Sequence, residues 1–113
     1  MLPKRRLKVG CFFYNIIMHS SHSSDNHGDT SLDHKIINLF HNGNIQVLKE
    51  TLLHEIEHVL MEDILKSTSG ISDIDEREEA MIRLVNPRRM LCTSDNKELF
   101  AWIYGLDKAE VKE

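Results

Sequence analysis

The spacing of apolar residues between positions 45 and 66 constrains the fold of this chain more than any other feature. An α-helix turns once every 3.6 residues, so side chains three and four positions apart lie on one face. We predict an amphipathic helix from Ile45 to about Lys66, ended by Ser67–Gly70, whose apolar face packs on the rest of the molecule. The apolar positions are Leu48, Leu52, Ile56, Val59, Leu60 and Ile64.

The segments before this helix predict a small sheet. Leu7–Met18 is rich in Val, Phe, Tyr and Ile, and Asp33–Phe40 has a similar apolar content, so both are expected to form strands. Gly10 indicates a bulge or a turn between two short strands. His19–Thr30 is almost wholly polar and is expected to be an exposed loop.

The segments after it predict one or two further helices. Ser72 or Asp73 can cap a helix over Glu76–Val85, whose acidic first turn suits the positive end of the helix dipole. Proline lacks a donor and clashes with the preceding turn, so this helix should kink or stop at Asn86-Pro87. A last helix is expected from about Asn96 to Tyr104, capped by Ser94 or Asp95 and ended by Gly105, with a frayed charged tail from Asp107.

Size and composition fit a single α+β domain over residues 1–113. A content of 41% hydrophobic and 28% charged residues excludes a disordered chain, a collagen-like repeat and a coiled-coil rod. The formal charge of −4 gives no broad positive field, so we expect no direct nucleic-acid binding. Apolar runs fall well short of the roughly 20 residues of a membrane helix, so no membrane partner is expected.

Cysteine content and the N-terminus favour a cytoplasmic protein. Two cysteines are too few for a disulfide scaffold. The basic residues Lys4–Arg6 before the apolar stretch Val9–Met18 imitate an export signal, but Gly10, Tyr14 and Asn15 interrupt that stretch. We therefore interpret it as a strand.

The long helix carries an H-E-x-x-H motif at residues 54–58. His54 and His58 lie one turn apart on the same face, so both imidazoles can bind one zinc ion at about 2.0–2.1 Å. Glu55 lies beside that face and can take a proton from a metal-bound water without being a ligand. It can later give the proton to the leaving amine. Glu55 is therefore the candidate general base and acid.

An open zinc site needs a third protein ligand, and the next segment offers acidic residues. Periodicity favours Glu78, because Met81, Ile82 and Val85 follow it at helical spacing. Acidic residues are also common in a first helical turn without binding metal.

His19, His22 and His27 are expected to be solvated loop residues. His34 and His41 are interpreted as surface histidines and Tyr104 as a packing residue, each with stabilisation of an oxyanion as the alternative.

The segment Thr51-Leu-Leu-His-Glu-Ile-Glu-His-Val-Leu60 resembles the active-site helix of small gluzincin-type metallopeptidases carried by phages and other bacterial mobile elements. These enzymes are related to the immunity-repressor peptidases of the ImmA/IrrE class. Leu7–Tyr14 is similar to their first strand, and Gly28–Asp33 followed by Lys35–Leu39 resembles their turn and second strand. Asp95–Ile103 resembles their C-terminal segment.

The resemblance implies a third ligand, a fold and an activity. The third ligand in this family is a Glu followed by apolar residues at +2, +3 and +6, which Glu79 matches. Where relatives continue with small residues, this chain departs with Asn86-Pro87-Arg88-Arg89. The implied fold is a small sheet against the metal-binding helix, with an edge strand that can hold an extended peptide.

We therefore expect a peptidase that uses one zinc ion, with His54, His58 and Glu79 as ligands and Glu55 as the catalytic residue. Its substrate would be a peptide or protein, and the resemblance makes a transcriptional regulator one candidate. The alternative is a metal-stabilised or catalytically silent interaction module encoded by a mobile element.

Overall fold

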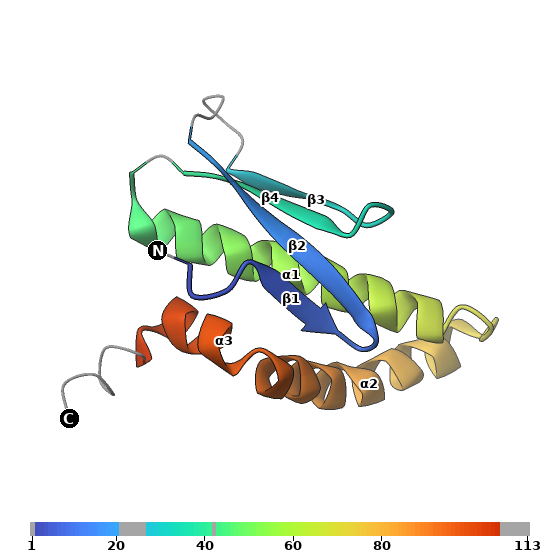
Figure 1. Ribbon diagram of the computed structural model, residues 1–113. Helices are drawn as coiled ribbons and strands as arrows, with labels where there is room; N and C mark the ends of the chain where they lie inside the picture. Colours follow the sequence, from blue (N-terminus) through green and yellow to red (C-terminus); the bar gives the residue numbers. More distant parts are fainter. Residues whose placement is uncertain (1, 21–26, 42, 107–113) are drawn as a thin grey trace.

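The computed structural model describes residues 2–20, 27–41 and 43–106, and within them it has the α+β class expected from the sequence (Figure 1). Four strands precede three helices. The strands are β1 (Arg6–Val9), β2 (Phe12–His19), β3 (Gly28–Ser31) and β4 (Ile36–Phe40), and the helices are α1 (Ile45–Ser67), α2 (Ile74–Asp95) and α3 (Lys97–Tyr104).

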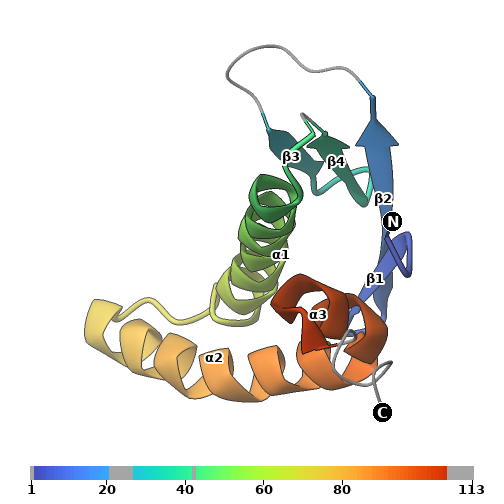
Figure 2. The ribbon, with the colours of Figure 1, turned by 90° about the vertical axis from the view of Figure 1, so that its left-hand side faces the viewer.

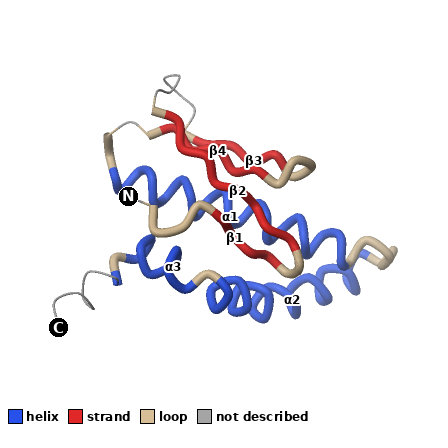
Figure 3. The backbone as a smooth tube through the Cα atoms, viewed as in Figure 1, coloured by secondary structure: helices blue, strands red, loops and turns tan. Residues whose placement is uncertain are grey.

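The four strands form one mixed sheet in the order β1-β2-β4-β3 (Figure 3). β1 and β2 form an antiparallel hairpin, and Gly10 adopts a φ of +62° at its turn, which glycine tolerates without strain. The turn alternative for Gly10 is thus confirmed. β2 pairs with β4 in parallel and β3 with β4 antiparallel, so β3 forms one edge of the sheet.

Helix α1 covers one face of the sheet because its apolar stripe and the inward-facing strand residues are buried together. Asn44 caps the helix by accepting hydrogen bonds from the backbone of Gln46 and Val47. On β2 the side chains alternate, with Tyr14 and Ile16 buried and their neighbours exposed. The shared core includes Leu7, Ile16, Ile37, Leu39, Leu48, Leu52, Ile56, Val59, Leu60, Leu99 and Phe100.

Helices α2 and α3 close the β1 side of the molecule, and the first half of α2 projects away from the sheet (Figure 2). Asn96, between these helices, joins them to β1. Its side-chain oxygen accepts from the Lys8 backbone N–H at 2.8 Å, and its amide donates to the Lys8 carbonyl at 2.7 Å. The amide thus satisfies two backbone groups of an edge strand, as a neighbouring strand would.

The structure differs from three sequence expectations for these elements. Within His19–Thr30, expected to be an exposed loop, His19 ends β2 and Gly28–Thr30 belong to β3. Of the two alternatives at Pro87, a kink or a stop, the stop is wrong, because α2 continues through the proline to Asp95. Two ion pairs with α1 hold the second half of α2: Arg88 pairs with Asp63, and Arg89 pairs with Glu57. Together with the burial of Cys92, these contacts offset the hydrogen bond that proline cannot donate. The cap residue of α3 is Asn96 rather than Ser94 or Asp95.

Other expectations are confirmed or lie outside the described residues. Asp73 caps α2 by accepting from the Glu76 backbone at 2.9 Å, and Gly105 ends α3 in the left-handed conformation. His22 and the tail from Asp107 lie outside the described residues. None of the helices in the described part of the chain has the length and apolar character needed to cross a membrane.

Candidate metal centre

His54 and His58 lie on the side of α1 that faces away from the core, and their imidazoles converge. Both residues are exposed, and their Nε2 atoms are 3.1 Å apart with the rings in an edge-to-face arrangement. Two nitrogens bound to one tetrahedral zinc ion at about 2.0–2.1 Å stand roughly 3.3 Å apart. The separation of the two nitrogens therefore matches that at a zinc site, and an ion bound there would replace the hydrogen bond that now joins the two rings.

Glu55 lies about 100° further around the helix and points to the sheet. Its residue is only 5% exposed, which is rare for a glutamate without a partner. The partner is Thr30 of β3, whose hydroxyl donates to Glu55 Oε1 at 2.7 Å. A short bond of this kind to a carboxylate is stronger than a bond between neutral groups, and it fixes the carboxylate beside the histidine pair.

The close approach of β3 to α1 depends on a glycine. A Cβ atom at Gly28 would lie 2.7 Å from the Thr51 methyl group and 2.9 Å from the Asn38 carbonyl oxygen. Any larger residue would therefore push the strand away from the helix. Since side chains alternate along a strand, Gly28 and Thr30 face α1 while Asp29 faces away and accepts from the Asn38 amide at 2.8 Å.

A cleft of about 480 Å³ runs between the edge strand β3 and the exposed side of α1. One wall holds the histidine pair and Glu55, and the other holds the edge strand. Apolar side chains occupy the end of the cleft toward the C-terminus of α1. The lining residues are Gly28, Asp29, Thr30, Leu32, His54, Glu55, His58, Met61, Glu62 and Leu65.

The predicted third ligand, Glu79, does not line this cleft. It lies on the exposed first half of α2 and pairs with Arg83 at 3.4 Å. Glu78 lines a separate apolar groove of about 530 Å³, to which Leu65 of α1 also contributes. The structure thus brings together His54, Glu55 and His58, while the two glutamates considered as third ligand stand apart from them.

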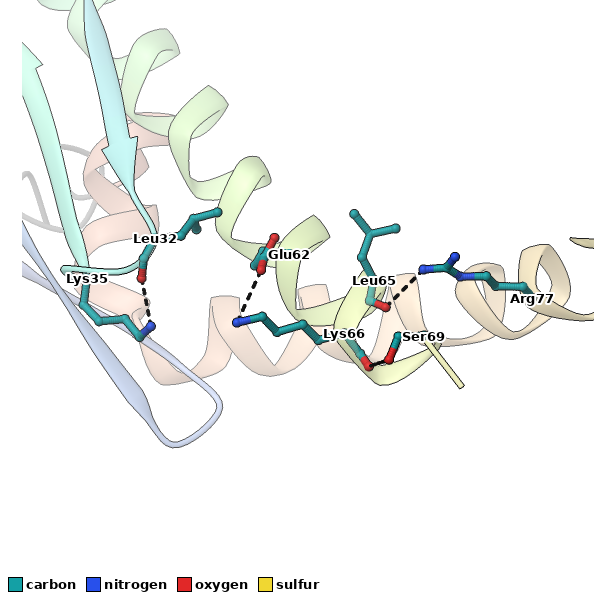
Figure 4. Close-up of polar contacts among 7 residues, drawn as sticks. All are labelled: Leu32, Lys35, Glu62, Leu65, Lys66, Ser69 and Arg77. Carbon is teal, nitrogen blue, oxygen red and sulfur yellow. Dashed lines mark hydrogen bonds and ion pairs between the residues drawn. The ribbon is translucent and has the colours of Figure 1, made fainter. Parts of the chain in front are cut away.

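Glu62 is the second carboxylate of α1 that lines the cleft, but it lies two turns from His54. Eight residues of unbroken helix correspond to about 12 Å along the axis, too far for one ion to bind both. Its side chain pairs with Lys66 at 3.3 Å (Figure 4). Within residues 2–20, 27–41 and 43–106, no three His, Cys, Asp or Glu side chains form a group able to hold a metal ion.

The remaining histidines occupy other environments. His27 lines a smaller cleft of about 400 Å³ with His54 and Glu55, at the other end of β3. His34 is hydrogen-bonded to the Ser31 hydroxyl at 2.9 Å, and His41 follows β4. Tyr104 is 60% exposed at the end of α3. The surface interpretation of His34 agrees with its exposed position. Tyr104, expected to pack, is mostly exposed, with its ring centroid 6.3 Å from that of Phe100.

Thr30 is the residue of the site that sequence reasoning missed. The polar composition of residues 19–30 pointed to a loop, although Gly28, Thr30 and Leu32 alternate as one face of a strand does.

Comparisons of the chain with models of known protein families, with curated proteins and with solved structures found no match.

Proposed function

We propose that this protein is a zinc-dependent peptidase whose active site is the cleft between β3 and α1. The observation that carries the proposal is the convergence of two imidazoles on a helix beside a buried, hydrogen-bonded carboxylate. His54 and His58 supply nitrogen donors 3.1 Å apart, and Glu55 stands on the next residue of the same helix. Imidazole ligands at an open site suit zinc.

Zinc bound here would lower the pKa of a water molecule to about 7 and polarise the carbonyl of the peptide bond. The chain supplies the remaining chemistry. Glu55 accepts the proton of the attacking water and passes it to the leaving amine. As an edge strand, β3 can pair with an extended peptide and hold it across the cleft.

The third ligand is proposed to come from the first half of α2. Resemblance to gluzincin-type enzymes supports Glu79, and the alternative is Glu78, which lines the groove shared with Leu65. Either glutamate requires α2 to approach α1 more closely than in the structure described here. Two long hydrogen bonds from Arg77 hold the start of α2. One goes to the Leu65 carbonyl at 3.3 Å (Figure 4). The other goes to the Thr68 hydroxyl at 3.4 Å.

Zinc titration and hydrolysis of a fluorescent casein test this proposal together. We expect one zinc per chain, a loss of binding of at least 100-fold in His54→Ala and His58→Ala, and hydrolysis that is lost in Glu55→Gln with zinc retained. Comparing Glu78→Gln with Glu79→Gln identifies the third ligand by its larger drop in zinc affinity. Absence of zinc binding at saturating metal, or undiminished hydrolysis in Glu55→Gln, would contradict the proposal.

A second candidate function is the metal-stabilised interaction module, and one observation favours it. The groove between the end of α1 and the first half of α2 is largely apolar, with exposed fractions of 81% for Ile74 and 58% for Ile82. Exposed apolar surface of this kind is common at protein interfaces. Zinc bound without hydrolysis of any peptide by the wild type would select this function.

The cellular setting belongs to the same proposal. Cys11 and Cys92 are both free thiols, as expected in a reducing compartment, so we propose a cytoplasmic location. A transcriptional regulator remains a candidate substrate, as the resemblance to immunity-repressor peptidases implies.

A further inference from the structure

We propose that Thr30 is a positioning residue for the general base, holding the Glu55 carboxylate in the orientation that hydrolysis needs. This inference rests on the proposed peptidase function and deepens it. The structure supports it with one hydrogen bond, from Thr30 Oγ1 to Glu55 Oε1 at 2.7 Å. It joins the edge strand to the helix that carries both histidines.

The position of Glu55 makes an orienting partner necessary. A glutamate side chain has three rotatable bonds and, at the surface, samples many rotamers. Here the residue is 95% buried by its neighbours, since only 5% of its surface is exposed. A buried carboxylate without a donor is strongly disfavoured, so the Thr30 hydroxyl both compensates for lost hydration and selects one rotamer.

The donor can occupy only one side of the carboxylate. A threonine hydroxyl has a single hydrogen, and its use on Oε1 leaves Oε2 without a donor from Thr30. The arrangement thus separates an oxygen that is held from an oxygen that can accept a proton. Threonine also has a restricted χ1 angle, so the donor itself is well placed.

The backbone around Thr30 is fixed in turn. β3 pairs with β4 in a register that sets Thr30 opposite Ile37, a fully buried core residue. Gly28, two residues earlier on the same side, lets the strand approach Thr51 of α1 closely. The hydroxyl is therefore presented from the sheet at the level of Glu55 rather than from a loop.

Substitutions at Thr30 test the role of its hydroxyl. The comparison is between Thr30→Ser, which keeps the hydroxyl, and Thr30→Ala and Thr30→Val, which lose it. On zinc-loaded protein with a casein-derived peptide, we expect kcat to fall about 10- to 100-fold in the Ala and Val variants, because misplacement of a reacting group by an ångström has effects of this size. KM should stay within about twofold, and the Ser variant should retain at least about half of the wild-type kcat.

Two further measurements separate positioning from a purely structural role. Zinc affinity should be unchanged in all three variants, and a crystal structure of the Val variant should show Glu55 in a rotamer different from that of the wild type. Thr93→Ala is the matched control, since the Thr93 hydroxyl donates to the Arg89 carbonyl at 2.9 Å on the second half of α2 and does not line the cleft. It should leave kcat unchanged.

Failure of this inference is distinguishable from failure of the proposed function. If wild type cleaves nothing, or Glu55→Gln cleaves as well as wild type, the peptidase proposal fails. If Glu55→Gln is inactive but the Ala and Val variants retain wild-type kcat, the positioning role of Thr30 is overturned. Equal losses of kcat in the Ser and Ala variants would overturn it as well.

Discussion

The two sides of α1 differ in how firmly the structure around them is fixed. Toward the sheet, Leu52 and Ile56 are fully buried, and Glu55 is tied to the edge strand by Thr30. Toward the start of α2, the apolar side chains are mostly exposed, with Ile74 at 81% and Ile82 at 58%. Both regions have helical apolar spacing in the sequence, but only the apolar side chains of the first region are buried, against the sheet.

This difference teaches how much of the candidate site the fold itself determines. The histidine pair and Glu55 lie on a helix held by the core, so their mutual arrangement follows from packing of the sheet against α1. The glutamates considered as third ligand lie on the first half of α2, which Arg77 joins to the end of α1 and on which Ile74 and Ile82 are exposed. A site assembled from both regions would therefore be rigid on one side and adjustable on the other.

Matched truncations of apolar side chains should show the largest contrast between the regions. Leu52→Ala removes a fully buried side chain and should lower the free energy of unfolding by about 2–5 kcal/mol. Ile82→Ala removes a side chain that is 58% exposed and should change it by less than about 0.5 kcal/mol. Urea denaturation followed by circular dichroism measures both. Comparable losses would show that the first half of α2 is packed in solution.

The second half of α2 is distinguished from the first by a buried thiol. Burial, with smaller effects of Asp95 and Glu57, raises the pKa of Cys92 from 9.0 to about 11. The unfolded chain then releases this proton at lower pH than the folded chain, so stability is present below pH 9 and is lost as the pH rises toward 11. We expect a loss of about 2 kcal/mol by pH 10.5.

Cys92→Ala provides the control for this pH effect. Between pH 8 and 10.5, the free energy of unfolding of the variant should fall less steeply than that of wild type, because the variant lacks the buried Cys92 thiol and keeps every other titratable group. Parallel curves for wild type and Cys92→Ala would show that the end of α2 is open to water.

Gly28→Ala should weaken the contact between the sheet and α1. The added methyl group would meet the Thr51 side chain at 2.7 Å and the Asn38 backbone at 2.9 Å, so β3 must shift. Overpacking of this kind lowers the free energy of unfolding by about 1–3 kcal/mol. The same shift would lengthen the hydrogen bond from Thr30 to Glu55. We therefore expect the fold-decrease in kcat of the zinc-loaded protein to exceed the fold-decrease in its zinc affinity. Gly70→Ala, where a Cβ meets no atom within 4 Å, is the control.

Much of this architecture could be predicted from the sequence because local periodicity determines it. The stripe from Leu48 to Ile64 predicted α1, and Gly10 predicted a bulge or a turn, of which the structure has the turn. The same stripe predicted that His54 and His58 share a face, because four residues make about one turn. These features depend on residues close together in the chain, where spacing alone carries the geometry.

The rest depended on contacts between distant segments, which spacing does not reveal. β3 is a strand because Gly28–Ser31 pairs with β4, although its composition is that of a loop. Helix α2 continues past Pro87 because Arg88 and Arg89 pair with α1 and Cys92 is buried. Whether Glu78 or Glu79 binds metal depends on the crossing of two helices, so it stays a prediction.

The smallest expected effect concerns the ion pair that occupies Glu79. Arg83→Ala removes an exposed i,i+4 pair with Glu79 and should change the free energy of unfolding by only about 0.3–0.5 kcal/mol. If Glu79 is the third ligand, freeing its carboxylate should also raise zinc affinity by about twofold, since 0.4 kcal/mol corresponds to that factor. Arg83→Lys keeps a cation and should leave affinity near the wild-type value. An unchanged affinity in Arg83→Ala, together with a loss in Glu78→Gln, would assign the ligand to Glu78 and leave Glu79 as a surface residue of α2.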